Sequence, residues 1–179
     1  DIVVTEAVFE TRYGASLAQC DDCFVPVDLP FAFPYFGNVY TRAFFDGNGR
    51  VSFNFGSSDY TESIGELSVQ PLVSVLWNDW DASGIPGSGI FFNGGLPGRA
   101  VFTWLNIPPF PSSVNAPRVT IQTILFEDGR IQFGYNGIGV PFGVTGISAG
   151  QNSTLSVVDF SALGSFSVSG PSTVAEQFS

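Results

Sequence analysis

The chain has 179 residues, of which 44% are hydrophobic; this suffices for one domain with a sizeable core and excludes a disordered chain. Six arginines and no lysine stand against 16 acidic residues, giving a formal net charge of -10. This balance excludes a nucleic-acid partner, which needs a basic face, and argues against docking on anionic lipid. No apolar run of about 20 residues lacks Pro, Asp or Gly, so we expect no membrane insertion.

The residue types that are missing exclude most familiar catalytic sites. The sequence contains no histidine, lysine or methionine. It therefore cannot form a Ser-His dyad, a Schiff-base lysine, a P-loop lysine or a histidine zinc site. Carboxylate pairs remain, which could serve glycoside hydrolysis or cation binding. We expect a protein that is not an enzyme and has no cofactor, with calcium as the one candidate ion.

Short runs with period-two alternation predict many strands and no convincing helix. The first predicted strand is Ile2 to Tyr13. Further strands are expected at residues 31–36, 39–45, 50–55, 69–77, 89–92, 99–106, 118–126, 130–135, 144–148, 155–160 and 165–168.

The segments between these strands read as hairpin turns and two long loops. Turns are expected at Asp46-Gly47-Asn48-Gly49, Asn93-Gly94-Gly95 and Glu127-Asp128-Gly129, because Asp-Gly and Asn-Gly tolerate positive φ. Residues 57–66 and the Pro-rich residues 107–117 read as surface loops. We predict one all-β domain over residues 1–179, an antiparallel β-sandwich or flattened barrel.

Six segments occur in an order that resembles one known family. They are Leu29-Pro30-Phe31-Ala32-Phe33-Pro34-Tyr35-Phe36-Gly37-Asn38-Val39-Tyr40, Asp46-Gly47-Asn48-Gly49-Arg50-Val51-Ser52-Phe53, Val75-Leu76-Trp77-Asn78-Asp79-Trp80-Asp81, Ala100-Val101-Phe102-Thr103-Trp104-Leu105-Asn106-Ile107-Pro108, Phe126-Glu127-Asp128-Gly129-Arg130-Ile131-Gln132-Phe133-Gly134-Tyr135 and Thr145-Gly146-Ile147-Ser148-Ala149-Gly150. Together they resemble the NIDO domain, the extracellular domain of nidogen, also found in tectorin and in secreted bacterial proteins. The resemblance covers roughly residues 28–150. The N-terminal residues 1–27 and the C-terminal residues 151–179 lie outside it.

The resemblance implies a secreted or cell-surface β-rich module associated with adhesion, without a known catalytic residue set. Composition agrees with this setting, because only 12% of the residues are charged, which is unusual for a cytosolic domain. A sequence that begins at Asp1 without a signal-like stretch fits a mature secreted form or a trimmed chain.

Two acidic groups are candidates for a calcium site. Asn78, Asp79 and Asp81 place three oxygen-bearing side chains within four positions, and Asp21-Asp22 forms a second, weaker candidate. The alternative is that these carboxylates cap turns at strand ends.

Cys20 and Cys23 form a C-x-x-C sequence with two aspartates between them. A redox pair, half of a zinc site and a small disulfide loop are all open. The adjacent negative charge opposes thiolate formation, which redox chemistry and metal binding both require, so the disulfide is favoured.

Most aromatic residues on strands are expected in the core. Trp80 and Phe110 stand off the predicted strands and are therefore the candidates for binding a glycan or a partner protein.

Two functions remain. The first is an adhesion module that binds matrix, glycan or another cell through its loops. The second is a subunit of an extracellular filament or sheath that binds other copies of itself, because lysine, the usual guard of sheet edges, is absent. The opening segment could then act as a donor strand, with Ile2, Val4, Val8 and Phe9 as the assembly residues; the alternative is that it pairs within its own sheet.

Overall fold

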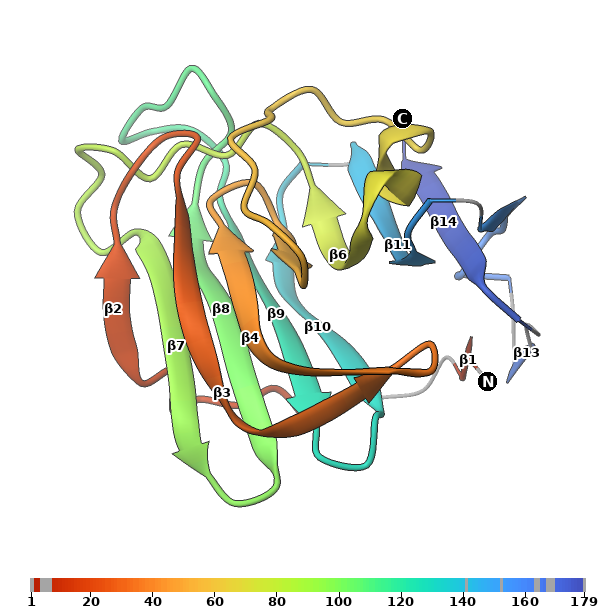
Figure 1. Ribbon diagram of the computed structural model, residues 1–179. Helices are drawn as coiled ribbons and strands as arrows, with labels where there is room; N and C mark the ends of the chain where they lie inside the picture. Colours follow the sequence, from red (N-terminus) through yellow and green to blue (C-terminus); the bar gives the residue numbers. More distant parts are fainter. Residues whose placement is uncertain are drawn as a thin grey trace.

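The computed structural model describes residues 2–3, 8–140, 142–151, 153–162, 165–166 and 170–178, with backbone only for residues 2–3 and 165–166. Its regular structure is almost entirely β-strand, and the strands form two packed sheets (Figure 1). Within these residues, no helix has the length and apolarity that crossing a membrane requires.

The first sheet has five antiparallel strands. In spatial order they are β10 (Ile131–Ile138), β9 (Val119–Phe126), β8 (Arg99–Ile107), β7 (Gly89–Leu96) and β2 (Ala15–Ala18). The second sheet has seven strands and one parallel pair, β12 with β14. In spatial order they are β12 (Thr154–Val157), β14 (Ser172–Phe178), β11 (Gly143–Ala149), β6 (Pro71–Trp77), β5 (Arg50–Ser52), β4 (Asn38–Asp46) and β3 (Phe24–Tyr35).

The core lies between the facing sides of the two sheets. In β3, alternate residues are buried, as a strand with one face on the core requires. Phe45 of β4 packs edge-on against Trp104 of β8, with ring centroids 4.6 Å apart. Both rings are fully buried, so aromatic packing joins the two sheets. Within the described residues, the two sheets are not joined by hydrogen bonds into one closed sheet. Of the two predicted architectures, the sandwich is therefore confirmed and the flattened barrel is not.

The segment before β2 corrects the predicted opening strand. Among the residues described before β2, β1 (Ile2–Val3) is the only strand, and it pairs with β13 (Ser165–Phe166) of the same chain. Val4 lies outside the described residues. Residues 8–14, called the strap below, are not a strand and cross the outer face of the five-stranded sheet, where the red trace passes behind β7 to β10 in Figure 1.

The outer face of the seven-stranded sheet has a cover of its own. Residues 53–70, called the cover segment, leave β5, pass over the sheet and end in the short 3-10 helix η1 (Glu66–Val69). Leu67 of η1 is fully buried against Leu72, Trp77 and Val144 of β6 and β11. These residues form a second, smaller core outside the sandwich.

The edges of the seven-stranded sheet are unequal. Edge strand β3 contains Pro26, Pro30 and Pro34, which lack the N–H group that a further strand would need. The expectation that the edges lack protection is therefore wrong for β3. Edge strand β12 has the sequence Thr-Leu-Ser-Val, with Leu155 45% and Val157 65% exposed, and carries neither proline nor charge.

Candidate functional site

Several loops gather at one end of the sandwich, which we call the loop end (Figure 1, top). Backbone contacts hold them side by side: Asp21 bridges to Asp81, and Trp80 bridges to Pro109. The Phe110 amide donates to the carbonyl of Asp79 over 2.9 Å. The loop end is therefore a fixed platform built from the regions around residues 20–23, 46–49, 78–83 and 108–112.

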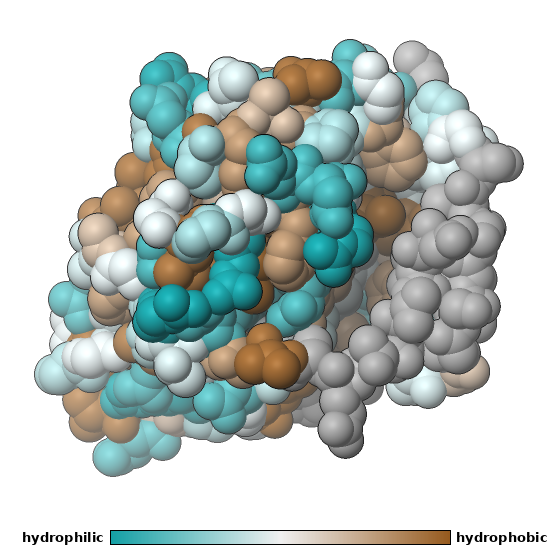
Figure 2. All heavy atoms as spheres, turned by 90° about the horizontal axis from the view of Figure 1, so that it is seen from below, coloured by the Kyte–Doolittle hydropathy of each residue, from teal (hydrophilic) through white to brown (hydrophobic). Residues whose placement is uncertain are grey.

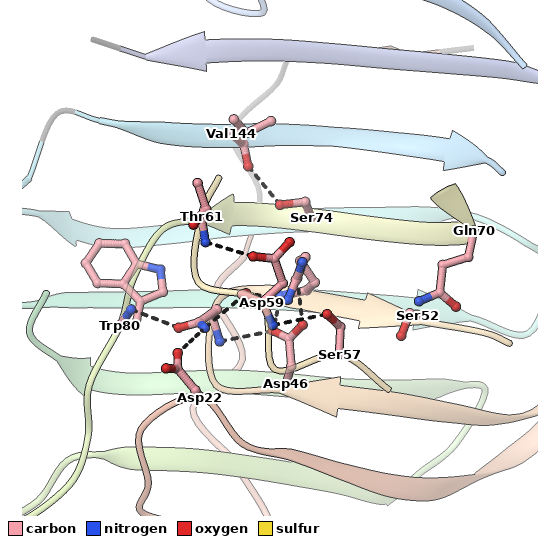
Figure 3. Close-up of polar contacts among 12 residues, drawn as sticks. Asp22, Asp46, Ser52, Ser57, Asp59, Thr61, Gln70, Ser74, Trp80 and Val144 are labelled. Atoms are coloured by element: carbon pink, nitrogen blue, oxygen red, sulfur yellow. Dashed lines mark hydrogen bonds and ion pairs between the residues drawn. The ribbon is translucent and has the colours of Figure 1, made fainter. Parts of the chain in front are cut away.

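Asn48 is the central residue of this platform. Its Oδ1 accepts the backbone N–H of Trp80 over 2.9 Å, and its Nδ2 donates to Oδ1 of Asp22 over 2.8 Å and to the carbonyl of Asp59 over 3.3 Å; Figure 3 labels these three partners. Its side chain is buried, with 1% exposure of the residue. The sequence around Asn48 predicts only a turn position, because a local pattern carries no signal for these long-range contacts.

Three carboxylates meet beside Asn48. One oxygen from each of Asp21, Asp22 and Asp79 lies within 4.8 Å of the others. Burial, followed by repulsion from Asp22 and Asp21, raises the pKa of Asp79 to about 6. Burial also raises the pKa of Asp21, with Asp81 and Asp22 adding to the shift. No ion pair within the described residues neutralises this group.

The predicted set Asn78, Asp79 and Asp81 does not converge as a unit. Asn78 is buried; its Oδ1 accepts the N–H of Asp79 over 2.7 Å, and its Nδ2 donates to the carbonyl of Phe142. The Asp81 carboxylate is likewise engaged in local bonds. Burial works against its charged form, but hydrogen bonds from Ser112 and Ser83 lower its pKa below the ordinary value.

The two predicted acidic groups thus contribute unequally to the carboxylate cluster. Asp79 joins Asp21 and Asp22, while Asn78 and Asp81 cap turns. Three carboxylates supply fewer than the six to eight oxygens that calcium takes. Calcium binding stays a prediction, now with Asp21, Asp22 and Asp79 as its ligands.

The cysteines hold the loop that carries two of these carboxylates. The sulfurs of Cys20 and Cys23 lie at disulfide distance, as the predicted small loop requires. Both thiols are used in this pair, and Asp21 and Asp22 sit between them. The disulfide limits the freedom of the loop that presents the carboxylates.

The two aromatic candidates differ. Trp80 is fully buried, and its Nε1 donates to the carbonyl of Leu76 over 2.8 Å, so the expected exposed binding role is wrong for it. Its side chain belongs to the main hydrophobic core, and its backbone is bonded to Asn48 and bridged to Pro109. Phe110 is 56% exposed, as expected, and its role in binding stays a prediction.

The predicted assembly residues have different positions. The backbone of Ile2 pairs with Phe166 of its own chain. Val8 is 87% exposed, whereas Phe9 is half-buried and lies against Gly134 of β10. None of these observations tests assembly between copies.

Comparison with known protein families identifies a match over nearly the whole chain. A family model described as NIDO related matches residues 5–176. Neither a curated protein nor a solved structure matches the chain.

Proposed function

Because the chain belongs to the NIDO-related family, which indicates an extracellular module, we propose that it is a non-catalytic adhesion module. The loop end is its binding surface, and its partner is a component of an extracellular matrix or of another cell.

The observation that carries this proposal is the composition of the loop end. The unneutralised carboxylates of Asp21, Asp22 and Asp79 lie beside a loop whose Phe110 side chain is exposed. Tyr60, from the loop that Asn48 holds through Asp59, is 54% exposed as well. Exposed aromatics on a rigid, charged platform are typical of binding surfaces.

The opposite end of the sandwich has no such group of three carboxylates among its described residues. Figure 2 views it from below: hydrophilic residues cover much of it, and hydrophobic residues are interspersed among them. This end contains the β3–β4, β7–β8 and β9–β10 hairpins. It supplies matched control positions.

The test is binding of the labelled protein to immobilised matrix proteins and to intact cells. Phe110→Ala should lower apparent affinity about tenfold, because an exposed aromatic anchor is worth ~1.4 kcal/mol or more. Val39→Ala, at the exposed tip of the β3–β4 hairpin, should leave binding unchanged. Equal binding by wild type and Phe110→Ala on every surface that is bound would refute the loop end as the contact.

Self-assembly is the second candidate function, and one observation favours it. Among the described strands β12 is an open edge whose side chains Leu155 and Val157 are exposed. The proposed contact is therefore β12, in addition to the N-terminal residues considered above. Negative-stain electron microscopy and light scattering test it: Val157→Lys should abolish assemblies formed by the wild type. Assemblies that persist in this variant would remove β12 from the proposal.

A further inference from the structure

A small cavity lies between the seven-stranded sheet and the cover segment. Its volume is about 120 Å³, well above the roughly 15 Å³ that one water molecule requires. Its lining comes from β4 to β6, from the loop after β5 and from η1. Phe55, Asp59, Glu66 and Trp77 are the lining residues that matter below.

A buried ion pair forms part of the lining. Nε of Arg50 donates to Oδ2 of Asp46 over 2.6 Å, and both side chains are at most 5% exposed. The Arg50 guanidinium lies over the Trp77 ring, 4.0 Å from its centroid, and donates to the carbonyl of Asp59. Asp46 therefore compensates the only positive charge in the lining, and the carboxylates of Asp59 and Glu66 remain.

Trp77 contributes a donor without an acceptor. Its side chain is fully buried, and its Nε1 has no hydrogen-bond partner among the described residues. The other two indoles are satisfied: Trp80 donates to Leu76, and Trp104 donates to Asp46. A buried N–H group without an acceptor destabilises the fold, so an acceptor supplied from outside would be stabilising.

The rim of the cavity is aromatic and held in place. Phe55 is 49% exposed, yet its N–H and C=O are both bonded to the side-chain amide of the buried Gln70, over 3.0 and 2.9 Å. Gln70 thus fixes the backbone from which the ring projects. Val69 of η1 adds a second apolar contact and is 46% exposed.

We propose that this cavity binds a saccharide, with the Phe55 ring against a sugar face and hydroxyl groups inside. Trp77 Nε1 can only donate, whereas the carboxylates of Asp59 and Glu66 can only accept. A carboxylate ligand would satisfy the donor and be repelled by the acids; an amine would satisfy the acids alone. A hydroxyl group both donates and accepts, so a neutral polyhydroxyl ligand satisfies both sides.

This inference rests on the proposed adhesion function and assigns it a ligand class at a site separate from the loop end. The two fail independently. Phe110→Ala should leave saccharide binding at the cavity unchanged, and a variant at the cavity should leave protein-mediated contact at the loop end unchanged.

The test follows the three indole N–H resonances in a proton–nitrogen correlation spectrum of the isotope-labelled full chain. The probes are the methyl glycosides of glucose, galactose, mannose and N-acetylglucosamine, each in the high millimolar range. At least one glycoside should move the Trp77 resonance downfield, as a new hydrogen bond does, with Trp80 and Trp104 unmoved. Triple-resonance assignment identifies Trp77 without any substitution.

Sodium acetate and guanidinium chloride at matched ionic strength are the competing probes. A Trp77 resonance that no glycoside moves means that the cavity holds water only, and this overturns the proposal. A shift with acetate or guanidinium but with no glycoside overturns the ligand class.

Variants at the rim locate the site. Phe55→Ala should raise the dissociation constant of the responding glycoside about tenfold, since the aromatic face is lost while the backbone bonds to Gln70 remain. Glu66→Gln should raise it less. Glu127→Gln, an exposed acid in the β9–β10 turn, is the matched control and should leave it unchanged. Equal dissociation constants for Phe55→Ala and wild type would overturn the placement.

Discussion

The outer faces of the two sheets are covered in different ways. The strap crosses the five-stranded sheet and touches β10, β9, β8 and β7 in turn before it becomes β2. The cover segment encloses an apolar cluster and a cavity over the seven-stranded sheet. Each cover is held by a buried glutamine whose side-chain amide binds both the N–H and the C=O of one residue in it.

The two covers differ in the space beneath them, although each has one buried donor nearby without an acceptor among the described residues: Arg99 Nε at the strap and Trp77 Nε1 under the cover segment. Gln122 of β9 accepts from Glu10 N, donates to Glu10 O and donates to Thr103, with each distance between 2.8 and 3.0 Å. Glu10 in turn pairs with Arg12 and Arg99. Under the cover segment, space and a free indole donor remain at Trp77. The strap is thus a structural clasp, whereas the cavity under the cover segment leaves capacity for a ligand.

The largest expected loss of stability comes from a variant that breaks the ion pair beneath the cover segment. Arg50→Met leaves the buried Asp46 carboxylate without its partner, and burial already raises the pKa of Asp46 against the opposing effect of Arg50. We expect a loss of about 3–5 kcal/mol in the free energy of unfolding, measured by urea denaturation at neutral pH. Arg130→Met breaks an exposed pair and should leave the free energy of unfolding nearly unchanged. Similar losses for the two variants would contradict the difference in burial.

The next largest loss of stability is expected from a variant that releases the strap from the sheet. Gln122→Leu removes the amide that pairs with Glu10 and should cost about 2–3 kcal/mol, because the strap's N–H and C=O lose their partners. Hydrogen exchange should increase at residues 8–13 and stay unchanged at β6. Gln132→Leu, which loses one exposed bond to Val8, is the control and should cost less than 1 kcal/mol. Unchanged exchange in the strap of Gln122→Leu would show that Gln122 does not hold it.

The acid limb of the stability curve sharpens the role of Glu10. Hydrogen bonds from the Arg12 side chain and backbone, together with the charges of Arg12 and Arg99, lower the pKa of Glu10 from 4.5 to about 2. Since the folded-state pKa is lowered, this stability is present above pH 4.5 and is lost as the pH falls toward 2. We expect about 2 kcal/mol after allowing for solvent around the exposed Arg12. Glu10→Gln should lose this part of the pH dependence between pH 5 and 2 in denaturation series; an identical acid limb would contradict it.

The smallest effect lies at the loop end and has the opposite sign. Because the pKa of Asp79 is raised to about 6, its charged form costs stability, and the cost appears as the pH rises from about 4 to above 6. Asp79→Asn should stabilise the fold by about 1 kcal/mol at pH 7, after allowance for solvent screening, and have no effect near pH 3. Thermal unfolding at the two pH values measures this.

The same variant tests the calcium prediction. Added calcium chloride should raise the melting temperature of the wild type, and a chelator should reverse the rise. Asp79→Asn should respond less, since one of the three carboxylates is gone. No rise in the wild type would contradict the calcium prediction.

Local sequence patterns located the hairpins well. Arg118 to Tyr135 folds as predicted around Glu127-Asp128-Gly129, giving β9 and β10. The turn expected at Asn93-Gly94-Gly95 lies later instead, because β7 passes through a bulge there and pairs Leu96 with Arg99. Period-two alternation marks a strand but gives no information on an irregularity within it.

The candidate site depended on contacts that local patterns do not encode. The acidic and cysteine motifs were recognised, yet their grouping was not, because Asp79 meets Asp21 and Asp22 only through the packing of separate loops. Residues 8–13 have strand-like composition, but Gln122 and Asn93 bind their backbone crosswise and prevent strand pairing along the sheet. Strand propensity thus identified a segment that packs on the sheet, but not that it runs across the strands of the sheet.

The three prolines of β3 also limit how copies of the molecule could associate. With one edge of the seven-stranded sheet closed, edge-to-edge pairing through that sheet leaves β12 against β12 of a second copy. Such a contact uses the same surface twice, so it is isologous, has two-fold symmetry and closes at a dimer. Growth into a fibre would need a second, head-to-tail contact elsewhere on the surface.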